Sequence, residues 1–213
     1  MERPRLGVQG LHAFLGTCTS DTAQSLLTAT MSTHPVINVD LVLDRSTTKE
    51  VLRAVLHSIL FHRLFGIVKP QTFEVQDVTM PGVDDPEIKQ LIQDKVDVFW
   101  RAVDLRGDKR GEINVLFTEK RARKTWYYLS SQEEEVPWEQ WKVKVVVQQP
   151  TSDRERQKFN SGLATTLTET LRTILKHTSS GEGRSCVPPI RDSKGISPFP
   201  VKITPIVGGV DLS

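Results

Sequence analysis

Histidine and cysteine side chains are the first candidates for catalysis or metal binding in this sequence. His57 and His62 lie five residues apart in a segment with helical periodicity, whereas two metal ligands on one helix face need a spacing of four. No cysteine or carboxylate joins them at ligand spacing, so we interpret both as core or polar-edge histidines. Cys186 has no sequence neighbour that would activate it as a nucleophile, and we interpret it as a buried or idle thiol.

Known catalytic motifs are also missing from the sequence. It contains no G-x-S-x-G, no H-E-x-x-H and no glycine-lysine phosphate-binding loop, and Gly181-Glu-Gly183 follows a predicted helix rather than a strand. We therefore expect that the protein is not an enzyme and uses no catalytic residue, cofactor or metal. An enzyme of unrecognised type would require scattered side chains to converge in a pocket.

The segment 119–138 combines charged residues with large aromatic rings. Trp126, Tyr127 and Tyr128 lie at its centre, and acids follow at 133–135. The cations that precede the rings are Lys120, Arg121, Arg123 and Lys124. A tryptophan in a connecting loop is a typical anchor for a protein partner. We therefore predict that the three aromatic residues bind a partner, and that the four cations are candidate contacts for lipid or for an acidic partner.

Three other interpretations of this segment remain open at this point. The two charged limbs can neutralise each other while the aromatic rings fold back onto the core. The segment can also act as a membrane-surface module, with the cations near anionic headgroups and Trp126 at the interface. Stacking of single-stranded nucleic acid on the rings is a further option. The acidic limb and a net charge of only +2 weigh against nucleic acid.

Three helices are predicted where a capping residue precedes apolar residues spaced three or four apart. Their starts are marked by Thr47 with Glu50, by Asp85 with Pro86, and by Ser152 with Glu155. The third helix carries an apolar residue at every fourth position from Phe159 to Leu175 and is expected to end near His177. A flexible break is predicted after it, at 179–183, because serine and glycine dominate there.

Strands are predicted where apolar and polar residues alternate. The expected strands span 37–43, 113–117 and 141–147, with edge strands near 201–207. A hairpin between the second and third would place 119–138 at its tip. Trp138 and Trp141 flank the start of the strand at 141–147, and we interpret both as packing residues. The order of elements predicts an α+β domain, with three helices on one face of a mostly antiparallel sheet and a C-terminal strand segment.

The length of 213 residues suits one domain with a proper core. Residues 1–30 show no sustained period, so we predict a poorly ordered N-terminal extension, or an alternative start at Met31, followed by one domain at 31–213. Cys18 and Cys186 do not make a disulfide framework, and the composition suits a reducing compartment.

Two blocks of sequence resemble the autophagy-related protein 101 family. They are Val136-Pro-Trp-Glu-x-Trp-x-Val-Lys-Val145, followed by Glu155-Arg-Gln157, and Ala54-Val-Leu-His-Ser-Ile-Leu-x-His-Arg63. The resemblance extends roughly from Met31 to Val207. It implies a HORMA-like domain and a non-enzymatic adaptor in autophagy initiation, located in the cytoplasm and at the phagophore assembly site.

The same resemblance implies specific partners. Family members pair with and stabilise the HORMA domain of autophagy-related protein 13, within the autophagy-initiating protein kinase complex, and they recruit downstream autophagy factors. The family's exposed Trp-x-Phe finger maps onto Trp126 and Tyr128, and here Tyr127 replaces the family's proline and Tyr128 its phenylalanine. The resemblance places the heterodimer surface around the helix at 153–177 and the nearby chain.

Overall fold

The computed structural model describes residues 34–123, 132–191 and 195–212. The predicted extension at 1–30 therefore lies outside the described residues. The same is true of Lys124, Trp126, Tyr127 and Tyr128. The elements below all belong to the domain that starts at Ser32.

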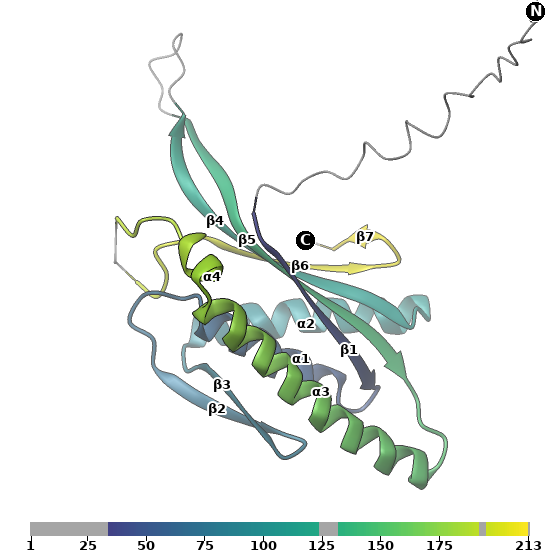
Figure 1. Ribbon diagram of the computed structural model, residues 1–213. Helices are drawn as coiled ribbons and strands as arrows, with labels where there is room; N and C mark the ends of the chain where they lie inside the picture. The colour runs from purple at the N-terminus through teal and green to yellow at the C-terminus, as the bar shows by residue number, and fades with distance from the viewer. Residues whose placement is uncertain (1–33, 124–131, 192–194, 213) are drawn as a thin grey trace, which may run out of the picture. The chain divides into compact units, whose positions relative to one another are not determined.

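A five-stranded sheet forms the centre of this domain (Figure 1). Its strands lie in the order β1-β5-β4-β6-β7. They span Val36–Asp44 (β1), Gln132–Gln148 (β5), Arg110–Arg123 (β4), Val201–Val207 (β6) and Val210–Asp211 (β7). All neighbouring strands are antiparallel except β1, which runs parallel to β5. The predicted α+β class with a mostly antiparallel sheet is therefore confirmed, and the arrangement is compatible with a HORMA-like fold.

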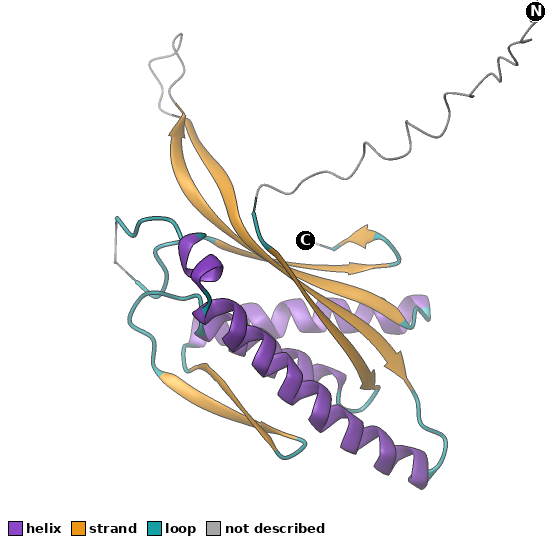
Figure 2. Cartoon of the chain, viewed as in Figure 1, coloured by secondary structure: helices purple, strands orange, loops and turns teal. Residues whose placement is uncertain are grey.

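The three predicted helices are present (Figure 2), and each contributes apolar side chains to the hydrophobic core. They are α1 (Thr48–Phe61), α2 (Pro86–Arg106) and α3 (Asp153–Ser179). Asp85 caps α2 as predicted, because its side chain accepts hydrogen bonds from the N–H groups of Glu87 and Ile88. Thr47 occupies the predicted N-cap position of α1, but its hydroxyl donates to the carbonyl of Asp44 and makes no capping bond, so the predicted capping box with Glu50 is wrong.

A short fourth helix, α4 (Gly181–Ser185), replaces the predicted flexible break at 179–183. The Ser180 hydroxyl accepts a hydrogen bond from the N–H of Gly183 at 2.9 Å and so caps the helix. The carbonyl of Gly183 in turn accepts a hydrogen bond from the buried Arg63 side chain. The prediction failed because this second contact joins residues 120 positions apart, which local composition does not reveal.

A separate two-stranded sheet packs on α1. It consists of β2 (Pro70–Val75) and β3 (Val78–Val83), which pair antiparallel. Gln76 and Asp77 form the turn between them with φ of 49° and 60°, the left-handed conformations that a two-residue hairpin needs.

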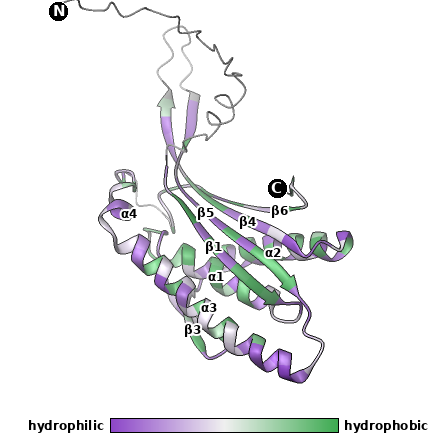
Figure 3. Ribbon diagram, turned by 45° about the vertical axis from the view of Figure 1, so that its right-hand side comes forward, coloured by the Kyte–Doolittle hydropathy of each residue, from purple (hydrophilic) through white to green (hydrophobic). Residues whose placement is uncertain are grey.

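The hydrophobic core lies between the helices and one face of the sheet (Figure 3). Alternate residues of the three neighbouring strands β1, β5 and β4 face the helices and are buried. They are Val39, Leu41 and Leu43 on β1, Ile113, Val115 and Phe117 on β4, and Trp141, Val143 and Val145 on β5. Each such side chain contributes roughly 1.5–3 kcal/mol through burial. The core therefore fixes the first half of β4 and the last half of β5.

Candidate functional site

Strands β4 and β5 continue beyond the edge of the sheet as a two-stranded ribbon (Figure 1). The partner strand β6 pairs with β4 only as far as Phe117, and β1 pairs with β5 only from Gln140 onward. Beyond these points, 118–123 pairs only with 132–137. The predicted hairpin is therefore longer than the sequence suggested, and its connection is limited to 124–131.

A β-bulge marks the root of this ribbon. Phe117 pairs with Glu139, while the next residue, Thr118, pairs with Pro137, so Trp138 is the extra residue on β5. A bulge changes the alternation of side chains along a strand. As a result, the adjacent residues Trp138 and Glu139 are both buried, with exposed fractions of 5% and 0%.

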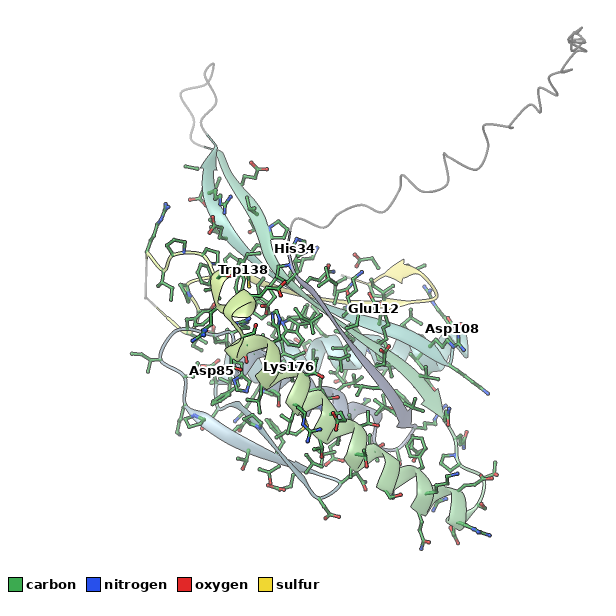
Figure 4. The ribbon with its side chains drawn as sticks, viewed as in Figure 1. His34, Asp85, Asp108, Glu112, Trp138 and Lys176 are labelled. Atoms are coloured by element: carbon green, nitrogen blue, oxygen red, sulfur yellow. The ribbon has the colours of Figure 1, made fainter. Side chains whose placement is uncertain are left out.

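Trp138 packs into an aromatic cluster at the root (Figure 4). Its ring centroid lies 5.3 Å from Phe117, 5.4 Å from Phe199 and 6.5 Å from Phe65. The guanidinium carbon of Arg63 lies 5.8 Å from the same ring centroid. Trp141 is fully buried as well. The interpretation of Trp138 and Trp141 as packing residues is confirmed.

Glu139 is a fully buried carboxylate surrounded by hydrogen-bond donors. Arg63 donates from Nε to Oε1 at 2.8 Å and from Nη2 to Oε2 at 2.5 Å. Trp141 donates from Nε1 to Oε1 at 2.6 Å, and His177 Nε2 lies 2.8 Å from Oε2. A buried charge is stable only when it is paired and hydrogen-bonded, and Glu139 meets both conditions.

Cys186 Sγ also lies 3.6 Å from Glu139 Oε2. These contacts join four parts of the chain, and we call the group Arg63, Glu139, Trp141, His177 and Cys186 the Glu139 anchor. Arg63 follows α1, His177 lies in the last turn of α3, and Cys186 follows α4. The anchor therefore fixes the root of the ribbon to the C-terminal ends of α1, α3 and α4.

The anchor contains three side chains of types that bind metals. Ligand atoms of Glu139, His177 and Cys186 lie within 4.8 Å of one another. The chemistry of the group does not fit a cation, however, because the Arg63 guanidinium already neutralises Glu139 and would repel a second positive charge. Burial, and next the Glu139 charge, raise the pKa of the Cys186 thiol to about 11, so it stays protonated. We interpret the group as a hydrogen-bonded structural anchor.

The structure separates the two histidines that the sequence offered as a pair. His57 is buried on α1 with its ring centroid 4.7 Å from that of Phe73, on the side of β2 and β3. Burial, and then the charge of Lys89, lower its pKa to about 4. His62 lies after α1 next to Arg63, and burial followed by the Arg63 charge also lowers its pKa. Within the described residues, neither histidine belongs to a cluster of metal-ligating side chains.

Charged residues along the ribbon partly neutralise each other. Lys120 Nζ lies 3.5 Å from Glu133 Oε2, and Arg121 pairs with Glu119. Both cations are more than half exposed, so these pairs contribute at most about 1 kcal/mol each. Of the other two predicted cations, Arg123 pairs with Gln132 through its backbone position, and Lys124 lies outside the described residues.

The Glu139 anchor was not predicted from sequence. A carboxylate between two tryptophans at the start of a buried strand was the one available signal, because a charge at such a place needs a partner. Apart from Trp141, its partners come from 38 to 76 residues away, and no spacing rule connects them. In the part of the chain that the structure describes, no helix has the length and apolar character needed to cross a membrane.

Comparison with known proteins agrees with the resemblance in sequence. The model of the protein family described as Autophagy-related protein 101 matches residues 40–194. Autophagy-related protein 101 from Arabidopsis thaliana is 28% identical over 177 residues, which cover 73% of this chain and 79% of the plant protein. The protein of the same name from Schizosaccharomyces pombe (strain 972 / ATCC 24843) is 30% identical over 105 residues, or 49% of this chain and 55% of the yeast protein. The matched region includes both the ribbon and the Glu139 anchor.

Proposed function

The chain belongs to the autophagy-related protein 101 family, and from this membership we propose that it is a non-enzymatic adaptor in autophagy initiation. Family membership supports a role in autophagy. The adaptor role is supported by the anchor. Its arginine, glutamate, histidine and cysteine are the described side chains best suited to catalysis, and they form hydrogen bonds with one another inside the fold. We place its action in the cytoplasm and at the phagophore assembly site.

The first partner that we propose is the HORMA domain of autophagy-related protein 13, in the autophagy-initiating kinase complex. Helix α3 supports a docking role because it has 27 residues, of which few are buried. The buried ones are Leu163, Leu167, Thr170 and Ile174. The remainder offers a long polar face to a second domain. Pairing would stabilise both chains by mass action.

The second proposed role is recruitment of downstream autophagy factors through Trp126, Tyr127 and Tyr128. The single observation that carries this proposal is the ribbon, which extends past the sheet edge and is fixed at its root by the Glu139 anchor. The three aromatic residues belong to the connection between its two strands. A large ring held on such a support can enter a partner's pocket at little entropic cost.

A double substitution, Trp126→Ala with Tyr128→Ala, tests the recruitment role. We expect unchanged folding and unchanged co-purification with the HORMA domain of autophagy-related protein 13, but loss of downstream factors from assembly sites in cells. Glu134→Ala, an exposed change on the same ribbon, is the matched control and should leave recruitment intact. If the double variant unfolds or loses its HORMA partner, the rings belong to the core or to the heterodimer and the finger proposal is wrong.

Peripheral membrane contact is the second candidate function. The exposed side chains of Lys120 and Arg121 favour it, since both lie on the ribbon that leads to the aromatic connection. Flotation with liposomes of neutral and of acidic lipid tests this function. Binding that requires acidic lipid, weakens in salt and is lost with Trp126→Ala supports membrane contact. Binding that is unchanged by salt and by Trp126→Ala contradicts it.

A further inference from the structure

A groove of about 490 Å³ lies beside the Glu139 anchor, between the ends of α1 and α3 and the chain after α4. Its apolar lining comes from Phe65, Leu175 and Val187. Its charged or basic lining comes from His62, Arg63 and Arg184, and no carboxylate belongs to the described residues that line it. The groove therefore combines an apolar surface with basic side chains and has no lining carboxylate among the described residues.

Arg63 brings a buried, partly unused guanidinium to this groove. The side chain is 2% exposed, and its Nε and Nη2 donate hydrogen bonds to Glu139 and to the carbonyl of Gly183. Among the described residues, the third nitrogen, Nη1, has no hydrogen-bond partner. Because Arg63 lines the groove, Nη1 is the donor that remains for an anion bound there.

Other groups in the groove define the size and charge of its ligand. The hydroxyls of Thr178 and Ser179 donate to carbonyls of their own helix, at Ile174 and Leu175, so they offer no free donor. Arg184 is exposed and supplies a positive charge that no lining carboxylate matches, whereas the charge of Arg63 is matched by Glu139. Leu175 is 51% exposed, although it is a large aliphatic side chain. A doubly charged phosphate would find few free donors here, whereas a single carboxylate beside an apolar side chain matches both surfaces.

We propose that this groove binds an acidic peptide segment of a partner protein. A carboxylate of the segment pairs with Arg63 Nη1 and Arg184, and a neighbouring aliphatic side chain packs on Leu175, Phe65 and Val187. This docking site is distinct from the proposed aromatic finger at Trp126, Tyr127 and Tyr128, and it uses a different partner chemistry.

Fluorescence anisotropy with the full-length chain tests the proposal. The probes are three fluorescein-labelled peptides, each with two adjacent leucines between runs of glutamate, which differ only in the spacing from leucine to the nearest glutamate. We expect saturable binding of at least one peptide, weakening as salt is raised. The same peptide with glutamine in place of glutamate should not bind. If none of the acidic peptides binds, or if the glutamine form binds equally well, the proposal is wrong.

Two substitutions at exposed positions locate the binding site without disturbing the anchor. Arg184→Glu reverses a charge at the rim, and Leu175→Asp removes the exposed apolar contact, so each should weaken binding at least about tenfold. Arg172→Glu reverses a charge on the same helix outside the groove and should change binding less than about twofold. Thermal unfolding confirms that all three variants fold. Equal binding by all of them would overturn the assignment.

Two further measurements exclude the other occupants. The peptide should also bind the heterodimer with the HORMA domain of autophagy-related protein 13, and loss of binding in that complex would mean that the groove belongs to the heterodimer interface. Vesicles containing phosphatidylinositol phosphate should neither bind through Arg184 and Leu175 nor displace the peptide. Displacement by these vesicles would identify a lipid headgroup as the ligand and overturn the peptide proposal.

Discussion

The two ends of the β4–β5 ribbon carry ion pairs in opposite surroundings. At the root, Arg63 and Glu139 are 2% and 0% exposed and are joined by two short hydrogen bonds. Further along, Lys120 and Glu133 are 56% and 66% exposed and lie 3.5 Å apart. A buried charge has lost its hydration and needs hydrogen-bond partners from the protein, whereas an exposed charge can still bind water. The root is therefore fixed in one geometry, and the charges along the ribbon stay free to exchange partners.

The largest expected effect follows from removing the buried charge. Glu139→Gln leaves the Arg63 guanidinium without its counter-charge in the core, so we expect a loss of about 3–5 kcal/mol in the free energy of unfolding. Urea denaturation followed by circular dichroism measures it. Glu134→Gln, the same change at an exposed position of β5, should stay within about 0.5 kcal/mol. If the two variants lose equal stability, the buried and exposed ends do not differ in the way described.

Replacing both members of the buried pair sharpens the same comparison. Arg63→Met with Glu139→Leu removes both charges and fills the space with apolar groups. Since no uncompensated charge remains, the double variant should lose less stability than the sum of its single variants, with a coupling of roughly 1–3 kcal/mol. Additive losses would show that the two side chains act through packing alone.

A pH series measures the contribution of His57, a buried ionisable group on α1 that lies outside the anchor. Burial lowers the pKa of His57 from 6.5 to about 4 in the folded state. Between these two values the unfolded chain binds a proton that the folded chain does not, so stability is full above pH 6.5 and is lost as pH falls toward 4. The loss is roughly 3 kcal/mol at most. Urea unfolding of the native chain and of His57→Leu measures it, and an equal slope in both would exclude His57 as the cause.

The smallest effect is expected at the exposed end of the ribbon. Lys120→Ala removes one member of the pair with Glu133 and should change the free energy of unfolding by less than about 1 kcal/mol, with the difference shrinking in high salt. Urea denaturation at low and high salt measures this change. A loss comparable to that of Glu139→Gln would contradict the contrast between the two ends.

Local chemistry explains which parts of the fold were predictable. The starts of α2 and α3 follow from Asp85 and Ser152, whose side chains cap N–H groups two or three residues away. The alternation at 141–147 likewise predicted the buried face of β5. The short helix α4 was missed because the serine and glycine residues there favour a break, and a distant arginine supplies one of its contacts. Thr47 marks the start of α1 as predicted, but the capping bond is absent because its hydroxyl donates to the carbonyl of Asp44 instead.

The candidate sites also differ in how far the sequence alone could predict them. Composition alone marked Trp126, Tyr127 and Tyr128, since aromatic rings between charged runs are unusual in a connection. The ribbon's length and its bulge at Trp138 depend on where β6 and β1 stop pairing, which the hairpin's own sequence does not state. The peptide groove required Arg63, Leu175 and Arg184 to meet, and only the packed helices bring them together.

By itself the sequence determined the helix and strand periods, the family resemblance and the aromatic segment, because each depends on residues that are neighbours along the chain. The tertiary structure alone decided that Glu139 would be buried, which donors would meet it, and which nitrogen of Arg63 would remain unused. The physical reason is that a buried charge is stabilised by whichever donors the fold places within about 3 Å, and two of these, Arg63 and His177, lie 76 and 38 residues away in sequence.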